Sequence, residues 1–254
     1  FDTRYEALSP KLGLRFEVDE RTQVFANVSR SFEPPSFGEL SGAQLLNVLA
    51  EQSATSFEVG TRGEYAPWAT RWDLAWYYAA LDDEFLSLAD ANGQPLGTIS
   101  ADDTVHRGLE LALETRLLER IEIRQTYLWT DAYFDGDRVF GDNALAGVPE
   151  HFYRAEFLYH WPRGYYAGPT VQWAPSDVPI DHANTLFADG YAIVGLRAGY
   201  LPPRGLAWFV DARNLTDEIY AASTGVIADA RGRDAAQFLP GDGVAVYGGV
   251  EWRF

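Results

Sequence analysis

The sequence predicts an all-β protein, an antiparallel meander of about eleven long, tilted strands that forms part of a transmembrane β-barrel. Two patterns predict this fold class. Apolar and polar residues alternate in eleven segments of about 8 to 11 residues, and the connections between the segments are short and long in turn. Soluble strands average about 5–6 residues and membrane strands about 9–11, so the segment length favours a membrane.

The last segment, 244–254, shows the alternation clearly. Val250, Trp252 and Phe254 fall on one side of this strand, whereas Glu251 and Arg253 fall on the other. Because successive side chains point to opposite faces, the strand has an apolar face and a polar face. Ten earlier segments repeat the pattern: 11–18, 22–31, 55–65, 71–79, 107–117, 121–131, 151–161, 164–174, 191–200 and 205–213.

The connections and the aromatic residues indicate what the apolar face meets. The long connections are 32–54, 83–106, 132–150, 175–190 and 214–243. Aromatic residues lie near short turns (Trp68, Trp161, Tyr200 and Phe254) and near long loops (Tyr127, Trp129, Trp173 and Tyr220). Two such girdles are typical of membrane interfaces, so we expect the apolar face to meet lipid. The alternative is a soluble β-sandwich, in which the same face would form the core.

An odd number of strands makes the first and last run in the same direction. Closing them would require a parallel pair, whereas bacterial barrels have even strand counts. We therefore expect an open half-barrel with two unpaired edges.

Charge is concentrated in the long loops. The net charge is −17; the five long connections hold 20 acidic and 3 basic residues, and the rest of the chain holds 17 of each. This balance excludes a nucleic-acid-binding surface and predicts a lumen of cross-strand ion pairs. The acidic rim is either a solvated surface or one that meets cations or cation-bridged lipopolysaccharide. It disfavours strongly anionic substrates. The candidate substrate-loop residues are the rim cations Arg138, Arg231 and Arg233 and the rim acids Asp229, Asp234 and Asp242.

Signals for catalysis, metals and cofactors are weak. The chain has no Cys, and its four His residues lack ligand spacing. One loop holds Asp102, Asp103 and His106, which could serve a hydrolase at the barrel rim, although solvated loop chemistry explains them as well. We therefore expect no enzyme, no metal site and no cofactor. The chain also has no Met, which is expected of a processed protein or an excerpt.

Several phrases resemble one known family. They are "LSPKLGLRFEVDERTQVFANVSRSFEPPSFGEL", "SFEVGTRGEY", "HRGLELALE", "GVPEHFYRAEF", "FVDARNLTDEIY" and the terminal "GVEWRF". In this order and spacing they are similar to the C-terminal half of a TonB-dependent outer-membrane receptor, and "SRSFEPPSFGEL" resembles the ferric-siderophore branch. The resemblance implies that 1–254 is the C-terminal part of a 22-stranded barrel. The N-terminal plug, the TonB box and the first half of the barrel would then be absent from this chain.

The resemblance also implies a function. It predicts TonB-energised uptake of an iron-siderophore-type chelate across the outer membrane of a Gram-negative bacterium. The implied partners are the chelate, the TonB complex through the missing N-terminal region, the barrel-insertion machinery, and outer-membrane lipid with lipopolysaccharide. Phe254, Trp252 and Val250 match the family's terminal assembly signal. No ligand contact can be assigned by motif, and a passive porin or channel barrel remains the alternative.

Overall fold

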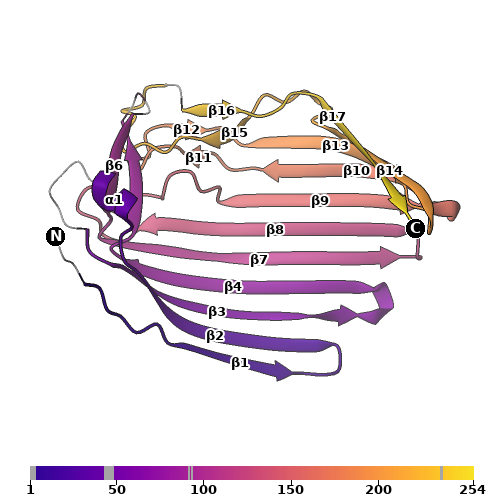
Figure 1. Cartoon of the computed structure of the whole chain (residues 1–254), viewed down its shortest axis with the longest axis horizontal. Helices are drawn as coiled ribbons and strands as arrows, with labels where there is room; N and C mark the ends of the chain where they lie inside the picture. The colour runs from indigo at the N-terminus through magenta and orange to yellow at the C-terminus, as the bar shows by residue number, and fades with distance from the viewer. Residues whose placement is uncertain (1–3, 43–48, 91, 93, 235–236) are drawn as a thin grey trace.

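The computed structural model describes residues 4–42, 49–90, 92, 94–234 and 237–254. Its main sheet has eleven antiparallel strands in sequential order, as predicted (Figure 1). These strands are β1 (Lys11–Glu17), β2 (Thr22–Glu33), β3 (Gln52–Tyr65), β4 (Thr70–Asp82), β7 (Asp103–Leu117), β8 (Ile121–Phe134), β9 (His151–His160), β10 (Tyr165–Ala174), β13 (Tyr191–Tyr200), β14 (Gly205–Arg213) and β17 (Ala245–Arg253).

The sheet is open, which confirms the expected half-barrel. In the part of the chain described here, β1 pairs only with β2 and β17 only with β14, so both are edge strands. Short turns lie at one end of the strands, on the right in Figure 1, and long connections lie at the other. No helix among the described residues is long and apolar enough to cross a membrane.

The predicted apolar face is continuous across the sheet. The strand register places apolar residues beside one another, as in the row Leu14, Ala26, Val59, Trp76, Leu109 and Trp129. Many apolar side chains of the outward face are exposed; Leu14, for example, is 71% exposed. A soluble protein rarely exposes an apolar surface of this extent, so the face is built for lipid.

Aromatic rings on the polar face lie over glycines of the neighbouring strand. Four directly paired positions show this arrangement: Phe25 with Gly60, Tyr77 with Gly108, Tyr166 with Gly199 and Phe209 with Gly249. A Cβ added to Gly60 would lie 2.3 Å from the Phe25 ring. Each ring therefore occupies the space that a side chain on its partner would need. We call these the ring-over-glycine pairs.

Several strands extend further towards the long connections than the alternation predicted. β2 continues to Glu33, β7 begins at Asp103 and β8 ends at Phe134. Beyond the lipid band, backbone pairing continues but no longer requires an apolar face, so the sequence gives no signal there. The connections that remain are 34–51, 83–102, 135–150, 175–190 and 214–244.

The long connections contain short elements of their own. Three two-stranded hairpins form there, and residues 85–89, which lie within the predicted connection 83–106, belong to one of them. The elements are α1 (Phe37–Gly42), β5 (Phe85–Ala89) with β6 (Pro95–Ser100), β11 (Val178–Pro179) with β12 (Phe187–Ala188), and β15 (Ala221–Thr224) with β16 (Phe238–Pro240). Two single 3-10 turns, Ala66–Trp68 and Pro162–Gly164, lie in the short connections.

The buried apolar cluster lies at the loop end of β8 and among the long connections. It contains Ala101, Ala132, Phe134, Phe140 and Leu145. The rings of Phe134 and Phe140 also pack against the buried His182, whose Nδ1 accepts a 3.3 Å hydrogen bond from the backbone N–H of Ala146. We call the described residues of 83–102, 135–150, 175–190 and 214–244 the loop block, because these four connections pack together.

One buried carboxylate joins two parts of the loop block. Asp181 is fully buried. Its oxygens accept hydrogen bonds from the Thr185 N–H (2.8 Å), the Thr185 hydroxyl (2.6 Å), the Leu186 N–H (3.0 Å) and the Ala230 N–H (2.9 Å). Burial raises the pKa of Asp181, but these hydrogen bonds outweigh it and leave the pKa below the ordinary value. Asp181 therefore stays charged and holds 214–244 against 175–190.

Candidate functional site

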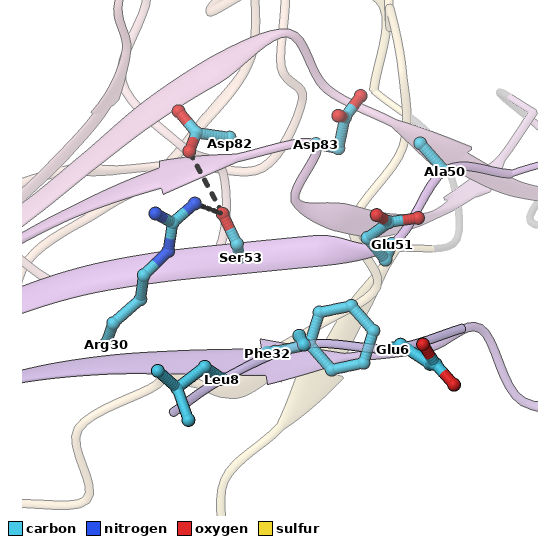
Figure 2. A pocket seen from close by; sticks show the side chains of 10 residues that line it. Glu6, Leu8, Arg30, Phe32, Ala50, Glu51, Ser53, Asp82 and Asp83 are labelled. Carbon is cyan, nitrogen blue, oxygen red and sulfur yellow. Dashed lines mark hydrogen bonds between the residues drawn. The ribbon is translucent and has the colours of Figure 1, made fainter. Parts of the chain in front are cut away.

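A cavity of about 560 Å³ lies at the loop ends of β2, β3 and β4. Arg30 donates a hydrogen bond to the Ser53 hydroxyl (3.5 Å), and Ser53 donates one to Asp82 (3.0 Å), as the dashed lines in Figure 2 mark. The strand alternation that turns Val28 and Phe57 outward also turns Arg30 and Ser53 outward. The cavity therefore opens on the outer face, away from any path through a barrel.

The charge of this outer cavity also argues against an anion site. Its walls carry four carboxylates and one arginine, namely Glu6, Glu51, Asp82, Asp83 and Arg30. Burial raises the pKa of Asp83, and the neighbouring carboxylates, beginning with Asp82, raise it further. Size alone therefore does not identify the functional cavity.

The polar face carries a ladder of ion pairs, as the charge balance predicted. The pairs cross from β7 to β14 through Glu114–Arg116 (3.2 Å), Arg116–Glu122 (3.8 Å), Glu122–Arg124, Arg124–Glu156 (3.2 Å), Glu156–Arg197 (2.5 Å), Arg197–Asp211 (3.2 Å) and Asp211–Arg213 (2.9 Å). Asp211 is buried, and two arginines neutralise it. The wall is thus polar but balanced in charge.

A smaller cavity, of about 160 Å³, opens on this polar face. We call it the lumen cavity; β9, β10, β13 and β14 form its wall and the 214–244 connection covers it. Its lining includes Arg154, Arg197, Arg213, Asp211, Asp242 and Tyr220. Gly195 also lines it, and a Cβ there would lie 2.5 Å from the Thr170 hydroxyl oxygen. The glycine therefore keeps the floor of the cavity free of a further side chain.

The lumen cavity corrects one expectation and adds residues that the sequence did not indicate. Tyr220, expected in the outer aromatic girdle, instead packs against Tyr191 in a tilted arrangement with ring centroids 4.6 Å apart, and it lines the cavity. The arginines of the cavity belong to the part of the chain whose charges sum to zero, so a charge count concealed them. Their positions on the polar face of adjacent strands were the available signal.

The six substrate-loop candidates do not form one site. Arg138 donates two hydrogen bonds to Asp102, at 2.6 and 2.7 Å, and these lower the pKa of Asp102. Arg231 lies 3.8 Å from Asp229. Arg233 and Asp234 are exposed, whereas Asp242 lines the lumen cavity and accepts a 2.9 Å hydrogen bond from the Tyr247 hydroxyl. A role for these residues in binding stays a prediction.

The expected cluster of Asp102, Asp103 and His106 in one loop is wrong. Asp103 and His106 belong to β7, and His106 Nε2 lies 3.0 Å from a Glu84 oxygen. Burial raises the pKa of Glu84, but hydrogen bonds from His106 and Thr104 outweigh this effect. Nowhere in 4–42, 49–90, 92, 94–234 or 237–254 do three His, Asp or Glu side chains converge to hold a metal ion.

The residues expected to form the assembly signal lie at the edge of the sheet. Val250 and Trp252 point outward from β17 beside Trp208 and Leu206 of β14. Phe254 follows this strand and is fully exposed. Their role in assembly stays a prediction.

A wide antiparallel sheet with a lipid-facing apolar side and an ion-paired polar side defines a segment of a transmembrane β-barrel. The family model described as "TonB dependent receptor-like, beta-barrel" matches residues 1–215. The chain therefore belongs to the TonB-dependent receptor β-barrel family, whose members reside in the outer membrane of Gram-negative bacteria and are transporters, not enzymes.

Among curated proteins, the chain is similar to the metal-pseudopaline receptor CntO of Pseudomonas aeruginosa, in strains UCBPP-PA14 and PAO1. The identity is 22% over 219 residues, which are 84% of this chain and 30% of the relative. The chain thus spans less than a third of the length of these relatives.

Solved structures share the fold. The ferric citrate transporter FecA has a TM-score of 0.78 at 18% identity, and the match covers 97% of this chain and 38% of that one. The copper transporter OprC has a TM-score of 0.78 at 16% identity, covering 97% and 39%. The ferric-catecholate receptor Fiu of Escherichia coli K12 has a TM-score of 0.70 at 18% identity, covering 94% and 34%. At these identities the similarity establishes the fold alone.

Proposed function

We propose that this chain is the C-terminal barrel wall of an outer-membrane receptor that takes up a metal chelate, driven by TonB. The observation that carries the proposal is the lumen cavity: a set of arginines and acids on the polar face, with Tyr220 of the 214–244 connection beside them. A concave site with a few converging polar groups is the usual form of a small-molecule site.

The relatives support a chelated metal as cargo, with iron as the first candidate. Their names refer to ferric citrate, ferric catecholate, copper and metal-pseudopaline. An iron-siderophore-type chelate fits this range best, because three of these names describe a metal held by an organic ligand. The residues that contact the metal itself would then belong to the chelate and not to the protein.

The proposal also includes the remainder of the receptor. The chain covers 34–39% of the solved structures named above, and its sheet is open at β1 and β17. A plug domain, a TonB box and further strands would therefore complete the barrel. The TonB complex would contact that region, whereas the barrel-insertion machinery would contact β17.

Growth on defined metal chelates tests this function. A strain without the receptor gene would receive the full-length gene and would grow with ferric citrate, a ferric hydroxamate, a ferric catecholate or a copper chelate as its sole source of the metal. We expect at least one chelate to support growth, and the growth to disappear in a strain without TonB. Growth on no chelate would contradict the receptor proposal, and growth without TonB would favour the passive porin.

The acidic rim provides a second, separable proposal. The acidic excess of the long connections should slow the approach of strongly anionic chelates, within the screening length of about 8–10 Å. Replacing Asp229 and Asp234 with asparagine should speed capture of ferric citrate, most at low salt. Equal capture rates for the wild type and the variant at every salt concentration would show that the rim does not steer the substrate. The rim would then be a solvated surface, or one that faces cation-bridged lipopolysaccharide.

A further inference from the structure

The three arginines of the lumen cavity differ in how they are paired. Arg197 contacts Glu156 at 2.5 Å and Asp211 at 3.2 Å. Arg213 contacts Asp211 at 2.9 Å and lies over the Tyr247 ring at 4.8 Å. Arg154 makes no ion pair or hydrogen bond with any residue that the structure describes. One cation of the cavity is therefore available.

The neighbours of Arg154 do not supply a hidden partner. Arg154 stands beside Thr126 of β8 and Gln172 of β10 on the polar face. Gln172 donates instead to the Tyr191 hydroxyl at 3.0 Å. The two carboxylates of the cavity are also engaged, because Asp211 pairs with two arginines and Asp242 accepts from Tyr247. The positions directly paired with Arg154 thus carry neutral side chains, and the charged groups of the cavity already have partners.

The size of the cavity limits what this cation can bind. A volume of about 160 Å³ corresponds to about five water molecules at roughly 30 Å³ each. That space fits one carboxylate or similar oxyanion group, and is too small for a protein segment. An arginine presents its donors in a planar fork that matches a carboxylate.

We infer that the lumen cavity is a binding subsite for one oxyanion group of the chelate, with Arg154 as its anchor. This inference rests on the proposed function and narrows the substrate class to chelates with an exposed carboxylate-type group. The net charge of such a chelate can remain close to zero, which is compatible with the acidic rim. Arg197 and Arg213, already neutralised, shape the cavity.

Chemical protection of the arginine tests the subsite without knowledge of the natural chelate. Purified full-length receptor would react with phenylglyoxal, and mass spectrometry would give the modification rate of each arginine. The matched control is Arg71, an exposed arginine on the same face at the opposite end of the sheet. We expect citrate to slow modification of Arg154 at least threefold relative to chloride at equal ionic strength, and glycerol to have no effect. Equal protection of Arg71, no protection by citrate, or an unreactive Arg154 would each overturn the inference.

A second measurement links the subsite to uptake. With a chelate that supports growth in the test above, Arg154→Gln should raise the concentration for half-maximal uptake by about 10- to 100-fold, as for loss of a charge-assisted hydrogen bond. Arg71→Gln should leave this concentration unchanged, and Arg154→Lys should have an intermediate effect. Normal uptake by Arg154→Gln would overturn the subsite and leave the receptor function intact. Growth on no chelate would overturn the receptor function alone, because protection of Arg154 by citrate is measured separately.

Discussion

Replacing Asp181 with alanine should loosen the contact between the 214–244 connection and 175–190, which backbone hydrogen bonds between 180–183 and 227–228 also hold. The carboxylate accepts four hydrogen bonds, and three of the donors are backbone N–H groups of Thr185, Leu186 and Ala230. Ala230 is itself buried, so its N–H would lose its partner without gaining water. The substitution therefore removes a charged acceptor and leaves donors unpaired.

The expected effect is large but local. A hydrogen bond to a charged group contributes about 1.5–3 kcal/mol, and breaking a buried charged network costs about 3–5 kcal/mol. The strands carry their own ladder hydrogen bonds, so the opening free energy should fall in the loop block and not in the sheet. A decrease of about 3 kcal/mol corresponds to hydrogen exchange more than about 100-fold faster.

Hydrogen–deuterium exchange of the full-length receptor in detergent measures this effect. Peptides that cover 178–188 and 226–233 should exchange faster in Asp181→Ala, while strand peptides should not change. Asp229→Ala is the matched control, because among the residues that the structure describes the Asp229 carboxylate contacts only the nearby Arg231, and its removal should cost less than about 0.5 kcal/mol. Exchange that is equal in the two variants would refute the assignment of Asp181 as the main side-chain link between the two connections.

Three further predictions concern pH, packing and assembly. Burial holds the pKa of His182 below its ordinary value, and Glu84, Asp181 and Asp137 oppose this effect only in part. Protonation of His182 therefore favours the open form of the loop block, and the stability of the closed loop block should fall as the pH drops below about 6.5. Exchange at Ala146, corrected for intrinsic rates, should rise between pH 7.5 and 5.5, and a His182→Phe variant that kept the same rise would contradict this mechanism. Gly168→Ala should reduce the folded fraction in a heat-modifiability gel, because the new Cβ would lie 1.7 Å from the Phe157 carbonyl oxygen, an overlap costing about 1–3 kcal/mol or more; Gly248→Ala, with its nearest atom at 3.4 Å, should fold normally, and equal folding of both would contradict the packing argument. Deleting Phe254 from the full-length receptor should lower the amount inserted into the outer membrane without changing ligand affinity, and unchanged insertion would count against an assembly role for Val250, Trp252 and Phe254.

Alternation was sufficient to predict the strands, because lipid on one side and polar groups on the other impose a period of two. The outward direction of the residues in the row from Leu14 to Trp129 follows from this rule alone, whereas their alignment beside one another depends on the strand register. Beyond the lipid band the strands no longer need an apolar face, so alternation could not predict the ends of β2, β7 and β8. The loop block was also beyond reach, because Asp181, His182 and Ala230 meet only after four connections fold together.

The lumen cavity was predicted only in part. The expectation of cross-strand ion pairs was confirmed by Arg124, Glu156 and Arg197. Which arginine stays unpaired depends on the stagger between neighbouring strands, because a shift of two residues would move Glu156 from Arg124 to Glu122 or Thr126. The sequence contains the charges, but their partners follow from a register that the alternation does not determine.

The ring-over-glycine pairs determine part of that register. A shift of one residue would turn the apolar side chains into the lumen, and the lipid would oppose it. A shift of two residues keeps every side chain on its correct face, so lipid cannot distinguish it from the native alignment. Such a shift would move the Phe25 ring from Gly60 onto Glu58 or Arg62, and the Tyr77 ring from Gly108 onto His106 or Glu110. Each pair thus selects one register among the alignments that keep every side chain on its correct face. Neighbouring strands can therefore be aligned pair by pair, before any ligand or plug is present.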